Sequence, residues 1–410
     1  MTEGTERDSP RVGRTPVPEG RELDSPRVPR LESIDLLRGV VMALMALDRV
    51  REHLHRGALR FDPTDLARTD VALFLTRWVT HFCAPVFVFL AGAGAFLRGT
   101  RNESKLALSR FLLTRGLWLI VLEFTLVGAE WHMGPNLIPL IAQVIWALGV
   151  SMVALSVLIF LPTRVVGAIG VIIIAGHNLL DGLAPSRFGA LGPLWQALHA
   201  GGSWPPGDTP RVLFVYPVLP WIGVMAAGYA FGTLYRLPPA TRRVWLLALG
   251  LAPTAAFVAL RASNLYGDPH PWSVQARGAA FTILSFLNCE KYPPSLLYLL
   301  MTLGPALLLL VAAEYGMPRL ARPLIVLGRV PLFFYVLHLL VVDLLSIALA
   351  ITRYGPRVRQ TFANGLPADY GYGLVVVYVA WIGVLIAIYP ACAWFARLKS
   401  RSRAGWLSYF

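Results

Sequence analysis

Charged residues are scarce in this chain of 410 residues. Asp, Glu, Lys and Arg together make up 15% of it, whereas hydrophobic residues make up 56%. Soluble domains usually carry about 25% charged residues. The shortfall excludes a string of ordinary soluble domains and indicates a chain that is surrounded largely by lipid.

Cysteine is also scarce, and several ligand-binding motifs are missing. The three cysteines, Cys83, Cys289 and Cys392, do not form a pair with metal-binding spacing. We expect them to be small packing residues without a disulfide framework. The chain has neither HExxH nor CxxC, so no metal is expected, and the missing Walker loop argues against an ATP-driven pump.

The N-terminal segment lacks the apolar stretch and the cleavage site of a signal peptide. It is rich in Pro, Glu, Arg and Gly, and one pentapeptide occurs twice, at Asp8–Val12 and Asp24–Val28. Such low-complexity composition predicts disorder. We expect residues 1–30 to form a disordered cytoplasmic tail, residues 31–398 a transmembrane bundle, and residues 399–410 a basic cytoplasmic tail.

Long apolar runs recur through the rest of the chain. Each is near the roughly 20 residues that a helix needs to cross a bilayer. They predict an all-α fold, a polytopic transmembrane bundle of about ten spans. In chain order, the runs cover residues 34–54, 71–97, 111–127, 137–161, 165–180, 212–234, 244–260, 295–313, 324–351 and 374–398.

The excess of basic residues predicts the orientation of this bundle. The formal net charge is +14, and with ten spans the Arg and Lys clusters at span ends fall on one side. By the positive-inside rule this side is cytoplasmic, so both termini are cytoplasmic. We expect a multi-pass protein of the bacterial plasma membrane, whose basic residues meet anionic lipids rather than nucleic acid.

Ionisable residues inside the predicted spans are the sharpest functional signal. Such residues are costly in lipid, so they usually face a polar interior and serve a function. The first span has Asp35, Arg38, Asp48 and Arg49, with His53 and His55 at its end; other spans have Arg77, His81, Glu123, His177, Asn178, Arg329, His338 and Asp343. They predict a polar chamber. The alternatives are solvated or snorkelling span ends and, for His338, an ordinary core histidine.

The predicted external loops combine polar and aromatic residues. One of them contains Asn264, Asp268 and Trp272. This combination suits a site that stacks on a sugar ring and forms hydrogen bonds with it. The alternative for any single Trp is the interfacial aromatic belt of membrane proteins.

Three stretches resemble a known family. They are Ser33–Gly39 with Met45–Asp48, Arg77–Gly92, and Gly328–His338, and the stretch Lys291–Leu296 supports them. Together they resemble bacterial membrane proteins with a heparan-alpha-glucosaminide N-acetyltransferase catalytic-type domain, and the resemblance extends from Arg30 to about Ala396.

The resemblance implies a transmembrane acyltransferase. Its relatives take an acetyl group from acetyl-CoA on the cytoplasmic side and deliver it to an amino or hydroxyl group of a sugar on the far side. For this chain it implies acyl-CoA as co-substrate, a sugar or glycolipid acceptor, and contact with membrane lipids; the oligomeric state is left open. The candidate residues for binding the coenzyme are Asp35, Arg38 and Arg77. The candidates for binding the acceptor are His177, Asn178, Asn264, Asp268, Trp272 and His338. The candidates for catalysis are Asp48, Arg49, His55 and His81.

The chain departs from the family at one important position. Bacterial members typically read Leu-Asp-His eleven positions after the Arg that corresponds to Arg38, but here the stretch is Leu47-Asp48-Arg49. An Arg does not lose its proton in a protein and so does not act as a general base. Three interpretations stay open: His53, His55 or His81 does the work, Arg49 stabilises an oxyanion, or acyl transfer is lost. A transporter that uses the same polar chamber is a further alternative.

Overall fold

We describe the protein from a computed structural model. It describes residues 31–100, 104–128, 140–207, 210–355, 367 and 369–402. All helices and strands below belong to the unit that covers residues 32–410. The expected tail 1–30 lies outside the described residues, as does most of the expected C-terminal tail.

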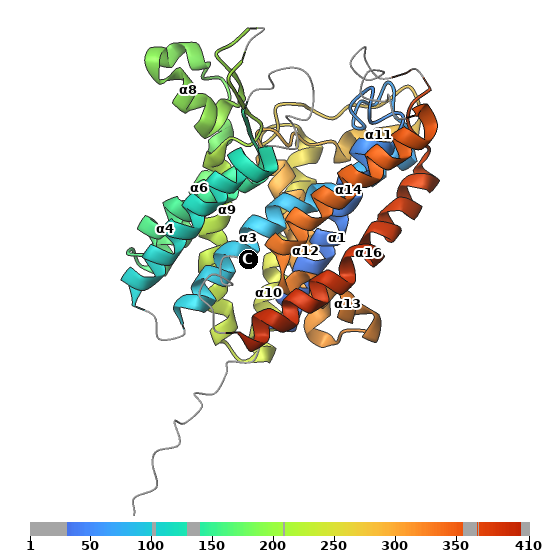
Figure 1. Ribbon diagram of the computed structural model, residues 1–410. Helices are drawn as coiled ribbons and strands as arrows, with labels where there is room; N and C mark the ends of the chain where they lie inside the picture. Colours follow the sequence, from blue (N-terminus) through green and yellow to red (C-terminus); the bar gives the residue numbers. More distant parts are fainter. Residues whose placement is uncertain are drawn as a thin grey trace, which may run out of the picture. The chain divides into compact units, whose positions relative to one another are not determined.

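The described residues form a bundle of long helices, which confirms the all-α prediction (Figure 1). Each predicted span contains one long helical segment, and the ninth contains a short helix before it. In order these are α1 (Glu32–Leu54), α2 (Val71–Val79) with η1 (Thr80–Phe82) and α3 (Cys83–Gly99), α4 (Lys105–Leu122) with η2 (Glu123–Val127), α6 (Val144–Leu158), α7 (Thr163–Gly176) with η3 (His177–Leu180), α9 (Val218–Phe231) with η6 (Gly232–Arg236), α10 (Pro239–Ser263), α12 (Leu296–Tyr315), α14 (Pro331–Tyr354) and α16 (Leu374–Arg401).

Seven of these segments in the described part of the chain are long and apolar enough to cross a membrane. They are 71–99, 163–180, 218–236, 239–263, 296–315, 331–354 and 374–401. The other three segments are either less apolar or shorter: α1 and α4 carry several charges, and α6 has only 15 residues. The chain is therefore a multi-pass membrane helix bundle.

Helices α1, α3 and α12 lie in the interior of the bundle. The apolar windows of 71–99 and of α12 are 72% buried, whereas those of 163–180, α10 and α16 are 17% buried. Outward side chains such as Val244, Ile386 and Val375 are 68%, 69% and 76% exposed. Apolar outward faces suit lipid contact, so the polar groups of α1 lie where neighbouring helices enclose them.

The predicted ninth span is divided into two helices. The short helix α13 (Arg322–Arg329) ends before Val330, whose backbone leaves the helical region, and α14 begins at Pro331. Proline suits the first position of a helix because its missing N–H has no helical partner there. The break separates Arg329, which lies near α1, from His338 and Asp343.

In two other predicted spans the helix begins later than expected, because a strand precedes it within the span. A small sheet has the order β1-β3-β2, in which β1 (Leu140–Ala142) is parallel and β2 (Gly202–Trp204) antiparallel to β3 (Val212–Phe214). The register pairs both Ile141 and Ser203 with Leu213. The remaining short elements are η4 (Pro185–Leu191), α8 (Gly192–Trp195), η5 (Gln196–Ala200), α11 (Ala279–Leu287) and η7 (Arg319–Ala321).

Two glycines let α1 and α13 pack with their backbones in contact. A Cβ atom on Gly39 would fall on the carbonyl oxygen of Leu324, and one on Gly328 would fall on that of Asp35. Small residues permit such close approach between membrane helices. Both glycines belong to the stretches that carry the family resemblance, so their presence there has a packing reason.

Candidate active site

The carboxylate of Asp48 joins the first two spans. Asp48 and Arg51 are three residues apart on one face of α1, and Arg51 Nη2 donates to Asp48 Oδ1 at 2.7 Å. Arg77 Nη1 donates to both carboxylate oxygens, at 2.9 and 2.8 Å, and Thr80 Oγ1 donates to Oδ1 at 2.8 Å. Two buried guanidinium groups thus share one carboxylate, which keeps the C-terminal half of α1 in a fixed position against α2 and η1.

A second polar cluster joins α1 to α14. Arg49 Nη2 lies 3.4 Å from Asp343 Oδ1, and His53 Nε2 lies 3.2 Å from the same oxygen. The side chains of Arg49 and Asp343 are 10% and 11% exposed. The unexpected Arg of the Leu47-Asp48-Arg49 stretch is therefore the ion-pair partner of a buried carboxylate.

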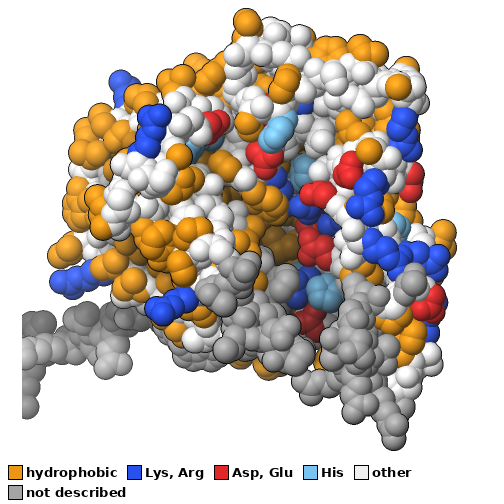
Figure 2. All heavy atoms as spheres, turned by 90° about the horizontal axis from the view of Figure 1, so that it is seen from above, with side chains coloured by type: hydrophobic (Ala, Val, Ile, Leu, Met, Phe, Trp, Pro, Cys, Tyr) orange, Lys and Arg blue, Asp and Glu red, His pale blue; other side chains and the backbone are white. Residues whose placement is uncertain are grey.

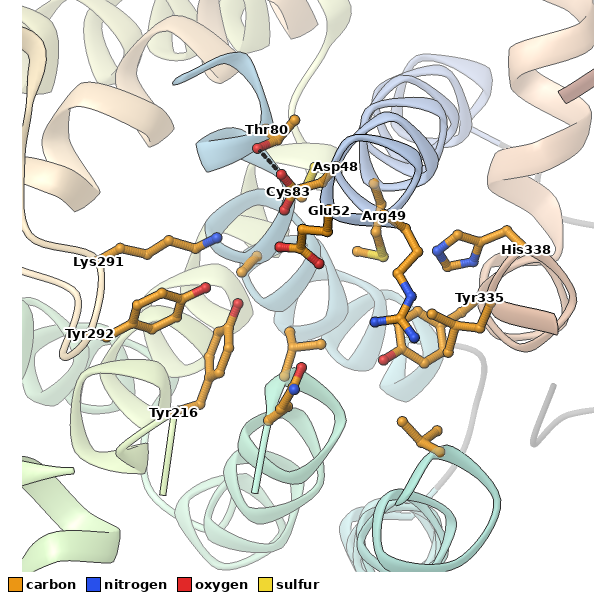
Figure 3. Close-up of a pocket in the computed structure, with 16 residues that line it drawn as sticks. Asp48, Arg49, Glu52, Thr80, Cys83, Tyr216, Lys291, Tyr292, Tyr335 and His338 are labelled. Atoms are coloured by element: carbon orange, nitrogen blue, oxygen red, sulfur yellow. Dashed lines mark hydrogen bonds between the residues drawn. The ribbon is translucent and has the colours of Figure 1, made fainter. Parts of the chain in front are cut away.

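A half-open cavity of about 100 Å³ lies beside these two clusters. Figure 3 shows Asp48, Arg49 and Glu52 of α1 between two other groups of residues. Lys291, Tyr292 and Tyr216 come from loops on one side, and Tyr335 and His338 come from α14 on the other. The cavity combines both signs of charge with three phenol groups.

His338 presents one free ring nitrogen at the wall of this cavity. Its Nδ1 lies 3.1 Å from the carbonyl oxygen of Phe334, so this nitrogen carries the proton. The ring is fully buried and stacks on Phe334. Its Nε2 has no hydrogen-bond partner among the described residues, which leaves a lone pair that could accept a proton.

A second cavity of about 240 Å³ lies next to the first and shares Lys291 and Tyr292 with it. Its wall also contains Asp62, Thr64, Arg77, His81, His270, Asn288, Cys289 and Glu290. Seen from the end that carries α8 and α11, the bundle has a hollow in which acidic, basic and histidine side chains gather (Figure 2). The second cavity is lined by Arg77 of α2, His81 of η1, and loop residues that follow α1 or flank α11.

His81 lies in the wall of the second cavity. It is 2% exposed, its ring packs edge-on against Tyr298, and its Nδ1 has no hydrogen-bond partner among the described residues. The Tyr298 hydroxyl donates to the His81 carbonyl oxygen at 2.8 Å and so fixes this turn of the backbone. His81 is thus a rigidly held histidine at the edge of a polar cavity.

The structure brings five of the sequence-predicted site residues to the two cavities: Asp48, Arg49, Arg77, His81 and His338. His55 lies just beyond α1 and lines neither cavity; its Nδ1 accepts hydrogen bonds from the N–H groups of Gly57 and Ala58, at 3.1 and 3.2 Å. Burial, followed by the Arg51 charge, holds the His55 pKa below its usual 6.5.

Asp35 and Arg38 lie at the other end of α1. Arg38 Nη2 donates to the carbonyl oxygen of Leu90 at 2.8 Å, and its Nη1 lies 3.9 Å from Asp35. Arg329 of α13 also approaches Asp35, at 3.7 Å. These contacts join α1, α3 and α13, and the predicted coenzyme contacts of Asp35 and Arg38 stay predictions.

The predicted acceptor residues of the external loops support the backbone around the cavities. Asp268 accepts hydrogen bonds from the N–H of Glu290 at 2.8 Å and from Ser295 Oγ at 2.7 Å. Asn264, in the left-handed region with φ 52°, exchanges two hydrogen bonds with the backbone of Trp272. Asp268 therefore positions the segment that carries Lys291, Asn264 fixes the backbone at Trp272, and neither Asp268 nor Asn264 is in the wall of the two cavities.

His177 and Asn178 also lie outside the two cavity walls. They are in η3, and Asn178 Oδ1 accepts a hydrogen bond from the N–H of Leu296 at 2.9 Å. This bond connects η3 to the start of α12. His177 belongs to a different cluster, which is described below.

Two residues that line both cavities, Lys291 and Tyr292, were not predicted as site residues from the sequence. Lys291 is 8% exposed, and its Nζ lies 5.0 Å from the Tyr292 ring centroid. The sequence signal that could have indicated these two residues is the stretch Lys291–Leu296, which is part of the family resemblance. The position of Lys291 at the junction of the cavities depends on the fold of the segment 264–295, which includes α11.

The chain was compared with known proteins. Residues 30–263, more than half of the chain, match the family model described as heparan-alpha-glucosaminide N-acetyltransferase, catalytic. A search of curated proteins found no match. The matched range includes Asp48, Arg49, Arg77 and His81, and it ends before Lys291 and His338.

Proposed function

Since this chain belongs to the heparan-alpha-glucosaminide N-acetyltransferase catalytic family, we propose that it transfers an acetyl group from acetyl-CoA to an amino or hydroxyl group of a sugar. The family is a transmembrane acetyltransferase type. The proposal includes acetyl-CoA as the donor and a free or lipid-linked sugar as the acceptor. It also includes a location in the plasma membrane, with the basic span ends in the cytoplasm.

The observation that carries the proposal is the pair of adjoining polar cavities, each with one buried histidine. His338 faces the smaller cavity and His81 the larger one, and Lys291 lies in both walls. Acyl transfer needs a base for the acceptor and a positive charge or hydrogen-bond donor for the developing oxyanion. The two cavities contain both kinds of group within one interior region.

In the proposed reaction, His81 acts as the general base. It removes a proton from the acceptor amine or hydroxyl while that atom attacks the thioester carbonyl carbon. The new C–N or C–O bond forms, the C–S bond breaks, and the CoA thiolate leaves and takes up a proton. Lys291 and Arg49 carry the positive charge that stabilises the oxyanion of the tetrahedral intermediate.

The cavity sizes support a division between the two substrates. Volumes of about 100 and 240 Å³ are below the roughly 300–1,000 Å³ of sites that enclose a drug-sized ligand. They suit the reacting ends of the substrates rather than a whole coenzyme. We assign the acetyl group to the smaller cavity, and the acceptor to the larger cavity with its polar loop residues.

The test is acetyl transfer by the purified full chain in nanodiscs. Radiolabelled acetyl-CoA is supplied with glucosamine, and both labelled product and free CoA are measured. We expect transfer by the wild type, a loss of about 10²-fold or more in His81→Gln because a general base is removed, and activity in His55→Gln near that of the wild type. Loss of transfer in His55→Gln with retention in His81→Gln would assign the base to His55.

The alternatives give different results in the same preparation. A catalytically inactive family member produces neither labelled product nor free CoA with any amino sugar or glycolipid offered. A transporter moves labelled sugar into proteoliposomes without acetyl-CoA. Either result, with a correctly folded protein, contradicts the proposed transfer.

A further inference from the structure

Three potential metal ligands meet outside the two cavities. His177 of η3, Asp181 at the end of η3 and His199 of η5 each offer an atom, and these atoms all lie within 4.8 Å of one another. His177 and Asp181 are four residues apart, about one helical turn, and the chain returns to them at His199. The spacing of the three residues matches no common metal-binding motif, so the sequence motifs did not reveal this cluster.

His177 has nothing else to bind among the described residues. It is 2% exposed, and neither Nδ1 nor Nε2 has a hydrogen-bond partner there. Burying a polar group without a partner costs free energy, and buried polar groups are nearly always satisfied. The imidazole ring centroids of His177 and His199 are 5.8 Å apart, so one ligand could contact both rings.

Asp181 supplies both the charge and a route from solvent. Its Oδ1 lies 3.1 Å from His199 Nε2, and its side chain is 31% exposed, whereas that of His199 is 2% exposed. Neighbouring ligand atoms of a tetrahedral ion bound at about 2.0–2.1 Å are separated by comparable distances. The other carboxylate oxygen, Oδ2, accepts a hydrogen bond from Asn178 Nδ2 at 2.9 Å.

The Asn178 side chain fixes the orientation of this carboxylate. While Nδ2 donates to Asp181, Oδ1 accepts from the N–H of Leu296 at 2.9 Å. Carboxylates that bind metals are commonly held by such outer hydrogen bonds. The cluster is therefore a set of two imidazoles and one oriented carboxylate.

We propose that His177, Asp181 and His199 bind a divalent first-row transition metal ion, with Zn²⁺ as the representative ion. Two imidazole nitrogens and one carboxylate oxygen suit Zn²⁺ better than Mg²⁺ or Ca²⁺, which prefer oxygen ligands. Three protein ligands leave a fourth position for water. The ion connects the residues that follow α7 to η5, and so fixes the segment 181–200 to the bundle.

This proposal does not depend on acetyl transfer. The three ligands are absent from both cavity walls, so metal binding and acetyl transfer are measured separately. Zn²⁺ binding without acetyl transfer would support the metal site alone. Acetyl transfer without Zn²⁺ binding would support the proposed reaction alone.

The experiment measures metal binding to the full chain, purified without a polyhistidine tag and stripped with a chelator. After equilibration with Zn²⁺ and desalting, we expect about one Zn²⁺ per wild-type chain. We expect binding at least about tenfold weaker in His177→Gln and in His199→Gln. His270→Gln is the matched control, because this exposed histidine is outside the cluster, and it retains the wild-type stoichiometry. Thermal unfolding with and without Zn²⁺ should show a rise in Tm for the wild type and for His270→Gln only.

Two results overturn the proposal. One is wild-type protein that holds less than about a tenth of an equivalent of Zn²⁺. The other is unchanged affinity in both His177→Gln and His199→Gln. Should these variants not fold, X-ray absorption at the Zn edge of the wild type decides the question: two imidazoles with oxygen ligands support the site, and one imidazole or none contradicts it.

Discussion

Arg77 Nη1 donates to both carboxylate oxygens of Asp48, at 2.9 and 2.8 Å, and so joins α2 to α1. Arg51 approaches the same carboxylate at 2.7 Å, and its side chain is 2% exposed. Asp48 is therefore the nearest counter-charge of two buried cations, since their other acidic neighbour, Glu52, is more distant and 43% exposed. The acidic residue of the Leu47-Asp48-Arg49 stretch has a structural reason that is independent of catalysis.

Asp48→Asn should strongly destabilise the protein. Removing one member of a buried ion pair leaves uncompensated charge and usually costs several kcal/mol, so we expect a loss of about 3 kcal/mol in the free energy of unfolding. Unfolding in mixed SDS micelles measures this loss. Glu52→Gln is the matched control: its carboxylate is 43% exposed and lies 3.5 Å from Arg51 and 3.9 Å from Arg77, so the loss should be under about 1 kcal/mol.

Gly39→Ala should prevent the close packing of α1 against α13. The new methyl group would collide with the Leu324 carbonyl oxygen, which belongs to the backbone and has little freedom to move. We expect a loss of about 2 kcal/mol or more in the free energy of unfolding. Gly383→Ala in α16 meets no atom within 4 Å and should be neutral or slightly stabilising. Equal effects of the two substitutions would contradict the packing explanation.

His55 should make stability depend on pH below neutrality. Its pKa is lowered from 6.5, first by burial and then by Arg51, so the unfolded chain binds a proton at a higher pH than the folded chain. The contribution of neutral His55 is complete above pH 6.5 and is lost as the pH falls through the folded-state pKa. Protonation also removes the lone pair that accepts from Gly57 and Ala58.

The measurement compares Tm from pH 7.5 to pH 5.0 in the wild type and in His55→Gln. We expect the wild type to lose more stability than the variant over this interval. Parallel curves would show that His55 titrates alike in both states.

Arg49→His should lower acetyl transfer and not restore it. The substitution recreates the Leu-Asp-His stretch of the family, but it removes the guanidinium that lies 3.4 Å from Asp343 and lines the smaller cavity. Loss of that charge weakens oxyanion stabilisation in the proposed reaction. The assay is labelled acetyl transfer in nanodiscs. A gain of transfer in Arg49→His from an inactive wild type would instead support the interpretation that this chain has lost catalysis.

The positions of the helices were predictable because apolar runs of spanning length are a strong signal. The segments 71–99 and 296–315 lie close to their predicted ranges for this reason. The break at Val330 and the three-residue strands were not predictable, since apolar content alone does not distinguish a continuous helix from a strand or a helix pair. In two of the predicted spans the helix therefore begins later than expected.

The site was predictable only in part. Intramembrane charges indicated Asp48, Arg77 and His81, because lipid penalises such residues wherever they lie. Lys291 reaches the same region from a long loop without periodicity, and its place depends on Asp268 and on the Arg261 backbone contacts of that loop. The His177 and His199 cluster is likewise a product of tertiary folding.

The ion pair between Arg49 and Asp343 also bears on how the protein is made. Its members are 294 positions apart, so α1 leaves the ribosome long before α14 exists. Until α14 is inserted, Arg49 has no access to the carboxylate that it meets in the finished bundle. The first helix to be synthesised is thus among the last to reach its final environment, and a chain truncated before α14 should be recognised as incomplete by the membrane's quality-control proteases.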